Sequence, residues 1–140
     1  MNNYDFLVLS ASEFERLTRD LLQKHLGCYI ESFTSGRDGG IDLRYANVKD
    51  SENIIQCKRY KDYQSLKNNL SKEVEKVKTL APSKYYISTS VGLTPANKEE
   101  ILCMFKPFIK KTEDIFGKDD LNNLLSQFPD IEKQYYCLLY

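Results

Sequence analysis

The sequence predicts an α/β domain in which helices flank a mixed central β-sheet, with further helices at its C-terminal end. The first observation behind this prediction is the length of 140 residues, which is the size of one domain. The second is that strand-like segments rich in β-branched and aromatic residues alternate with segments of helical apolar spacing. The third is that two strand segments joined by a polar turn should pair as an antiparallel hairpin. A later strand is reached through a helix, so the sheet is expected to be mixed.

The first expected element is a helix over residues 12–26, because its apolar residues recur with helical spacing. Ser10 or Ser12 can cap its beginning, and Gly27 fits its C-cap. His25, the single histidine, lies in the last turn. We expect it to be a surface or capping residue rather than a catalyst.

The rest of the chain alternates strands and helices. Strands are expected over residues 29–33, 41–46, 53–60, 85–90 and 108–111, the second and third forming the hairpin. Helices are expected over residues 65–80, from Thr94-Pro95 to a point before Pro107, and over 118–127 and 129–139.

The formal net charge is zero, but the charge is unevenly distributed. Residues 53–111 hold twelve Lys/Arg and five Asp/Glu, a net charge of +7, whereas residues 112–140 hold two and six, a net charge of −4. A basic middle beside an acidic end is typical of a polyanion-binding body with a partner-facing end. Charge simply spread over solvated faces is the alternative, and both interpretations stay open.

Several classes of protein and site are excluded by composition and spacing. No run of 18 apolar residues is present, so no membrane span is expected, and the N-terminus lacks the pattern of a secretory signal. We therefore expect a cytosolic protein. The four cysteines are too widely spaced for a structural zinc site, and their apolar contexts predict buried free thiols.

The most informative stretch joins a glycine-rich loop and Asp42 to the strand that contains Gln56 and Lys58. Because side chains alternate along a strand, Gln56 and Lys58 point to the same face, where they are costly to bury unless they meet a polar site. Asp42 opens the partner strand and is expected opposite them. Asp42 and Gln56 offer oxygen ligands for Mg²⁺, and Lys58 can stabilise negative charge on phosphorus. This set suits phosphodiester hydrolysis by a metal-activated water, without a covalent nucleophile.

These residues also resemble the D…(E/Q)xK signature of the PD-(D/E)xK nuclease superfamily, with Gln56 fourteen residues after Asp42. The resemblance is closest to Mrr-like restriction endonucleases, which share a helix with Phe-Glu, an Asp-Gly-Gly-Ile-Asp turn and a Gln-Cys-Lys-Arg-Tyr strand. In this chain these are Phe14-Glu15, residues 38–42 and residues 56–60, in the same order. The resemblance covers roughly residues 10–112 and implies a restriction-endonuclease-like fold.

The resemblance further implies roles for individual residues. Asp42 is the main metal ligand, Gln56 holds the place usually occupied by an acid, and Lys58 is the catalytic lysine. Glu15, supplied by the first helix, completes the catalytic set and joins Asp42 and Gln56 around Mg²⁺ or Mn²⁺. Because Gln56 is neutral, we expect weaker metal binding than a glutamate would give.

Double-stranded DNA is the expected substrate. Arg37, Arg59, Lys61 and the lysines of the helix over 65–80 are expected to meet its phosphates. Asp38 is a candidate DNA contact, and equally a turn-forming residue. Two alternatives stay open: a nuclease-fold module that binds nucleic acid or assembles without cutting, and a nuclease that acts on RNA.

The nuclease domain is expected over residues 1–112, followed by a helical tail or linker over 113–140. The tail is similar to the segment that joins Mrr-like nuclease domains to a STAND-type NTPase in bacterial antiphage proteins. The chain has no P-loop sequence of its own. The resemblance therefore implies an effector domain of a larger defence protein, with a C-terminal NTPase domain as partner and a homo-oligomer as the active form.

Overall fold

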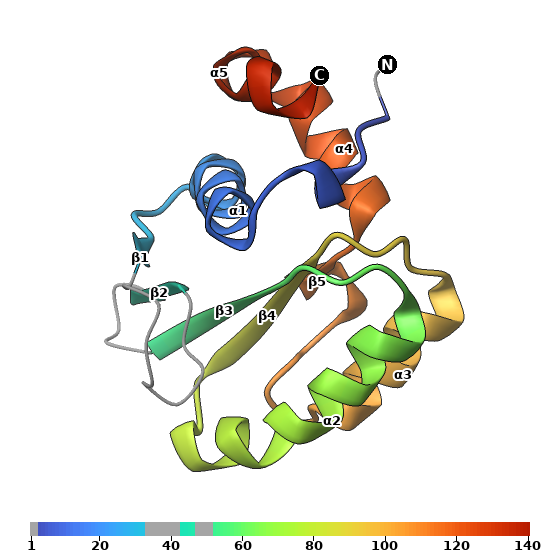
Figure 1. Ribbon diagram of the computed structural model, residues 1–140. Coiled ribbons are helices and arrows are strands. Elements are labelled where there is room, and N and C mark those ends of the chain that lie inside the picture. The colour runs from blue at the N-terminus through green and yellow to red at the C-terminus, as the bar shows by residue number, and fades with distance from the viewer. Residues whose placement is uncertain (1–2, 33–42, 47–51) are drawn as a thin grey trace.

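The computed structural model describes residues 3–32, 43–46 and 52–140. Within them, five strands form one sheet in the order β1-β2-β3-β4-β5 (Figure 1). Their bounds are Glu31–Ser32, Leu43–Ala46, Glu52–Lys58, Lys84–Thr89 and Ile115–Phe116. The first three strands pair antiparallel, and β3, β4 and β5 pair parallel. The expected hairpin and the mixed sheet are thus confirmed.

Helices cover both faces of this sheet. The α-helices are α1 (Ala11–Leu26), α2 (Tyr63–Leu80), α3 (Pro95–Met104), α4 (Lys118–Gln127) and α5 (Pro129–Leu139), and two short 3₁₀ helices are η1 (Phe6–Val8) and η2 (Thr112–Asp114). In Figure 1, α2 and α3 lie on one side of the sheet and α1 and α4 on the other, with α5 packed beyond them. In the described residues, no helix is both long enough and apolar enough to cross a membrane.

Helix α1 begins one residue earlier than expected and ends where expected. Its N-cap is Ser10, which forms a reciprocal capping box with Glu13. Its C-cap is Gly27 in the left-handed conformation, with φ of 68°, which glycine adopts without steric cost. His25 in the last turn is exposed, as expected, and its ring meets Phe116 edge-on at 5.8 Å between centroids.

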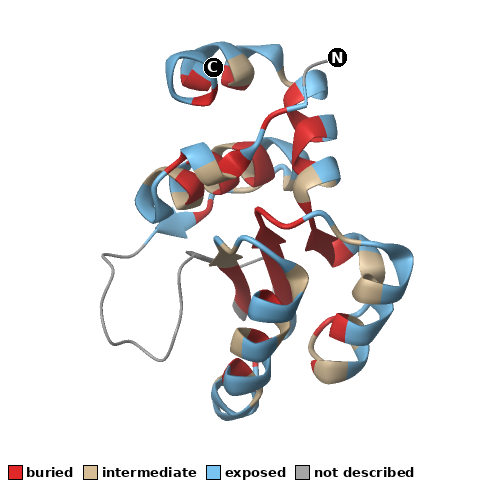
Figure 2. Ribbon diagram, turned by 45° about the vertical axis from the view of Figure 1, so that its right-hand side comes forward, coloured by how far each residue is buried: buried red, intermediate tan, exposed pale blue. Residues whose placement is uncertain are grey.

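The sheet separates two hydrophobic cores. On one face Ile55 packs in a cluster with Phe14 and Leu17 of α1, and on the other Ile54 packs with Leu66 and Leu70 of α2. Figure 2 shows the buried residues concentrated in the central strands and on the helix sides that face them. Each fully buried apolar side chain of this size contributes about 1.5–3 kcal/mol to the free energy of folding. The two clusters therefore determine which face of β3 each helix covers.

Two boundaries near the candidate site differ from expectation by two residues. Strand β3 ends at Lys58 rather than at residue 60, because the backbone of Tyr60 bonds to the Ser90 side chain instead of continuing the ladder. Helix α2 begins at Tyr63 rather than at residue 65, because Asp62 caps it by accepting a hydrogen bond from the backbone of Ser65.

The strand expected over residues 108–111 is wrong. That segment forms turns and irregular backbone, although the carbonyl of Phe108 accepts a hydrogen bond from the Tyr85 amide at 3.0 Å. The last strand is instead β5, which pairs with β4. Its two residues fill opposite cores, Ile115 on the α2 side and Phe116 on the α1 side, so β5 completes both layers at once.

The residues beyond 112 are packed into this structure. Besides β5, helix α4 places Leu121, Leu124 and Leu125 in the same core as α1. Asn122 accepts a hydrogen bond from the backbone amide of Tyr4 at 2.8 Å, which attaches α4 to the N-terminal segment. The division of the chain at residue 112 into a nuclease domain and a tail stays a prediction.

The expectation of four buried cysteines is wrong. Cys103 and Cys137 are exposed, and Cys28 and Cys57 are half-buried. The exposure of Cys103 follows from its place on α3. The buried residues Ile101 and Phe105 lie four apart on the inward side of the helix, which leaves Cys103 pointing outward. All four are free thiols.

Candidate functional site

The C-terminal half of β3 presents two polar side chains to the face that α2 covers. Gln56 is only 4% exposed, and its side-chain oxygen accepts a hydrogen bond from the Tyr85 hydroxyl at 3.4 Å. Tyr85 belongs to the core on the α2 side, and so does Ile54 two residues before Gln56. The alternation expected for this strand is therefore present, with Ile55 on the opposite face.

Lys58, two residues further along β3, lies against a carboxylate from α2. Its Nζ atom is 3.6 Å from Oε2 of Glu73, and the two side chains are only 11% and 8% exposed. The other oxygen of Glu73, Oε1, is 3.3 Å from Nζ of Lys76. One nearly buried carboxylate thus lies between a nearly buried lysine and a lysine on the helix surface.

The chain that follows Lys58 is held in place by Ser90. The Ser90 hydroxyl accepts from the backbone amide of Tyr60 at 2.9 Å and donates to the Tyr60 carbonyl at 2.7 Å. The backbone amide of Ser90 donates to the Lys58 carbonyl at 3.3 Å. Partial burial, together with the negative charge of Glu73, raises the pKa of the Tyr60 phenol. The strand end, Tyr60 and Glu73 therefore share one environment.

The predicted site residues are only partly within the described structure. Gln56 and Lys58 lie together on one face of β3, whereas Asp42, Arg37 and Asp38 lie outside the described residues. Glu15 is half-buried on α1, whose core contacts are on the opposite side of the sheet from Glu73. The convergence of Glu15, Asp42, Gln56 and Lys58 stays a prediction.

Arg59 and Lys61 follow β3 and are among the described residues predicted to contact nucleic acid, and Arg59 has clear structural partners. Arg59 donates from Nε to the Leu9 carbonyl at 2.5 Å and from Nη2 to the Leu7 carbonyl at 2.6 Å. It thereby ties the N-terminal segment to the end of β3. Lys61, two residues later, is exposed. Contact of either residue with a phosphate backbone stays a prediction.

Glu73 is a site residue that the sequence analysis missed, although the sequence contains a signal for it. Helix α2 buries Leu66, Leu70, Glu73 and Val77, and Val74 is only half-buried. Those four positions follow the spacing of four, three and four residues that lies on one helix face. A glutamate at a position of this otherwise apolar helix face is the sequence feature that indicates a buried carboxylate.

The described donors agree in chemistry with a hard divalent cation. Gln56 provides an amide oxygen and Glu73 a carboxylate near the end of β3, and oxygen ligands suit Mg²⁺ and Mn²⁺. In the described parts of the chain, His, Cys, Asp and Glu side chains form no group of three that could hold a metal ion. Asp42, the predicted main metal ligand, lies outside those parts.

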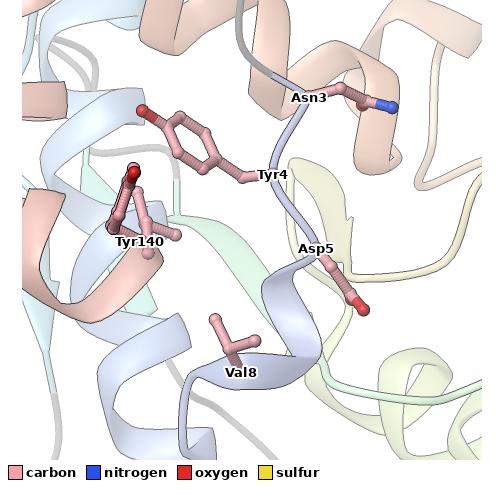
Figure 3. Close-up of a pocket in the computed structure, with 6 residues that line it drawn as sticks. Asn3, Tyr4, Asp5, Val8 and Tyr140 are labelled. Carbon is pink, nitrogen blue, oxygen red and sulfur yellow. The ribbon is translucent and has the colours of Figure 1, made fainter.

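Two cavities of the described structure lie away from Gln56, Lys58 and Glu73. One of about 330 Å³ is lined by the N-terminal segment and the end of α5, and Figure 3 shows the aromatic rings of Tyr4 and Tyr140 there. Another of about 280 Å³ lies beside His25, Lys98 and Asp120. Gln56, Lys58 and Glu73 line neither of them.

Comparisons with known proteins identify the family of the chain. The family Mrr_cat, described as restriction endonuclease, matches residues 6–101, a span that contains α1, β3, α2 and β4. The uncharacterized protein y4cD of Sinorhizobium fredii (strain NBRC 101917 / NGR234) is 42% identical over 134 residues, which are 94% of this chain and 21% of that protein. The chain thus spans about a fifth of the length of this curated relative. No solved structure matches the chain.

The family match covers the strand and helix that hold Lys58 against Glu73, as well as most of the mixed sheet. The fold is therefore restriction-endonuclease-like, and the chain belongs to the Mrr_cat family of restriction endonucleases.

Proposed function

We propose that this chain is a divalent-metal-dependent endonuclease domain that hydrolyses phosphodiester bonds in double-stranded DNA. The observation that supports it most directly is the nearly buried ammonium of Lys58 beside the buried amide of Gln56, on one face of a central strand. Burying these groups is costly even though Tyr85 and Glu73 pair with them, and a catalytic role accounts for that cost. The restriction endonuclease family supplies the reaction class.

In this proposal Lys58 stabilises negative charge as it develops on phosphorus, an effect that is strong where water is largely excluded. Gln56, Asp42 and Glu15 would hold Mg²⁺ or Mn²⁺. The bound metal supplies polarisation of a phosphoryl oxygen and a bound water of lowered pKa. Gln56 contributes a neutral oxygen, so the charge that balances the cation has to come from the carboxylates.

The DNA backbone would be held by basic side chains near the end of β3. Lys61 is exposed directly after the strand, and α2 carries further exposed lysines, namely Lys72, Lys76 and Lys78. Such contacts neutralise phosphates and position the duplex without reading its sequence. Arg37 and Arg59 are assigned to the same surface because of their positive charge, and Asp38 is a candidate contact there.

The chain is further proposed to act as the nuclease domain of a longer protein. A relative of which this chain spans about a fifth, and which is 42% identical over 134 residues, supports this. The proposed whole is a bacterial antiphage protein whose remaining part is a STAND-type NTPase. Its oligomerisation would bring nuclease domains together to cut both strands.

The experiment that tests the reaction is a plasmid-cleavage assay with Mg²⁺, Mn²⁺ or EDTA, run beside an RNA of similar length. We expect nicking or linearisation of the plasmid with either metal and none with EDTA. Cleavage of RNA in preference to DNA would reassign the substrate. Binding of both nucleic acids without cleavage of either would identify a non-cutting nuclease-fold module.

A further inference from the structure

Glu73 occupies a position where an apolar residue would be the ordinary choice. It lies on the inward stripe of α2 with Leu66, Leu70 and Val77, and its side chain is 8% exposed. A carboxylate buried at such a position is costly, and replacing a buried ion pair by apolar residues is often neutral or stabilising. Fold stability therefore does not explain why this position is acidic.

The partners of Glu73 indicate what its charge is for. Lys76 is 53% exposed and lies three residues away on the same helix, and surface pairs of this kind contribute little. Lys58 is nearly buried and reaches Glu73 from another element, β3. The Glu73 carboxylate is thus directed at a lysine of the sheet.

We propose that Glu73 is a positioning residue for Lys58. It fixes the ammonium at the end of β3 so that the remaining N–H groups of Lys58 can meet a phosphoryl oxygen. This inference rests on the proposed nuclease function. A lysine side chain has four flexible carbons and three donor N–H groups. Among the described residues, the Glu73 carboxylate at 3.6 Å lies on one side of the ammonium, and the proposal assigns the remaining N–H groups to the phosphoryl oxygen.

Four single variants test this role through rate and affinity. Glu73→Gln removes the charge at nearly constant volume, and Glu73→Asp keeps the charge but withdraws it by one methylene. Lys76→Ala removes the other partner of the same carboxylate. Glu75→Gln is the matched control, since Glu75 is 84% exposed on the same helix and, within the described residues, forms an ion pair only with Lys78 at 3.5 Å.

Misplacement of a reacting group by about 1 Å costs on the order of 100-fold in rate, so Glu73→Gln should lower the single-turnover cleavage rate by about 100-fold. The Kd for DNA, measured in EDTA, should stay within about threefold, because Glu73 does not touch the backbone in this proposal. Glu73→Asp should cut about tenfold faster than Glu73→Gln. Lys76→Ala should weaken DNA binding without changing the rate at which bound DNA is cut. Glu75→Gln should change neither the Kd for DNA nor the cleavage rate.

A second measurement needs no cleavage. Trace acetylation of the native protein, followed by mass spectrometry of each lysine, reports how firmly each amine is held. We expect Lys58 to react much more slowly than the exposed lysines Lys61 and Lys72 in the natural chain, and to approach their reactivity in Glu73→Gln. The relative reactivity of Lys61 and Lys72 should stay constant.

A folded Glu73→Gln variant with natural cleavage rate and slow Lys58 acetylation would overturn the proposal. If Glu73→Gln shows no cooperative melting, Glu73→Asp decides: a reduced rate with natural DNA affinity supports the role, and a natural rate contradicts it. If the natural chain cuts nothing with either metal, the proposed nuclease function fails. The acetylation of Lys58 then still shows whether Glu73 holds it.

Discussion

Lys58 takes part in both the proposed chemistry and the folded structure, because its ammonium is one half of a nearly buried ion pair. Removing one partner of such a pair leaves the other charge buried and poorly compensated. Here Lys76 remains beside Glu73, which moderates the loss. Activity and stability therefore have to be measured together for any substitution at this position.

Lys58→Met keeps most of the aliphatic stem and removes the charge. We expect cleavage to fall by at least about 100-fold, since the variant loses stabilisation of the developing charge. We expect the free energy of unfolding to fall by about 3 kcal/mol, the lower end for a broken buried pair. Lys133→Met, on the exposed side of α5 and away from the proposed DNA surface, is the matched control for both measurements. A folded Lys58→Met variant that cuts at the natural rate would show that the lysine is structural.

Gln56→Glu tests the neutral position on β3. It adds a negative charge next to the proposed metal, so the Kd for Mn²⁺ measured by calorimetry should decrease. Gln64→Glu makes the same chemical change on the exposed surface of α2 and should leave the Kd for Mn²⁺ unchanged. Weaker Mn²⁺ binding by Gln56→Glu would count against Gln56 as a ligand.

At the scale of elements, the end of β3 depends on β4 and its extension. Ser90 makes both side-chain bonds to Tyr60 and a backbone bond to Lys58, so it determines where the strand stops. The short strand β5 then closes the sheet on the other side of β4. These two contacts position the element that carries Gln56 and Lys58.

Ser90→Ala leaves two partly buried backbone groups of Tyr60 without their partner. We expect a loss of about 1–3 kcal/mol in the free energy of unfolding, read from urea melts. Ser71→Ala is the control, since its hydroxyl also donates to a backbone carbonyl, that of Lys67, but on the surface of α2. Equal, small losses in the two variants would mean that Ser90 does not secure the strand end.

Asp114, in η2 just before β5, gives a pH-dependent test. Burial raises the pKa of its carboxyl, while Lys111 and Lys84 act in the opposite direction, and its Oδ2 atom has no hydrogen-bond partner in the structure. A carboxyl with a raised folded pKa disfavours folding at neutral pH, and this penalty is relieved as the pH falls through that pKa. Asp114→Asn should therefore raise the melting temperature at pH 7, and the gain should shrink toward pH 4. Glu113→Gln, at the exposed neighbouring residue, should show no such convergence.

For the whole molecule, much of the architecture follows from local sequence signals. The capped ends of α1 and α3, the hairpin and the two C-terminal helices could be predicted because caps, turns and apolar periods are local. The strand over 115–116 could not, because two residues carry no period and are strands only through pairing with β4. Glu73 escaped prediction for a related reason, since its role depends on which strand α2 covers.

The assembly of the active form is also a property of the whole molecule. One metal site cuts one strand at a time, so a double-strand break is most simply made by two copies related by symmetry. We expect the isolated chain to sediment mainly as a monomer at micromolar concentration and to cut weakly. Sedimentation and cleavage should be measured on the same samples over a range of concentrations. A strictly monomeric chain that makes clean double-strand breaks at full rate would contradict the dimer and leave the site unaffected.

The bond from the Tyr4 amide to Asn122 has a consequence for biosynthesis, because it joins residues 118 positions apart. At about 5–20 residues per second, a ribosome needs between about 6 and 24 s to make the intervening chain. During that time the N-terminal segment has no α4 to bind. Arg59 donates hydrogen bonds to the carbonyls of Leu7 and Leu9 in that segment, so its environment is also incomplete until α4 has been made. A nascent chain that ends before α4 should therefore hold its first residues loosely, and the completed fold should appear only after the fourth helix has left the exit tunnel.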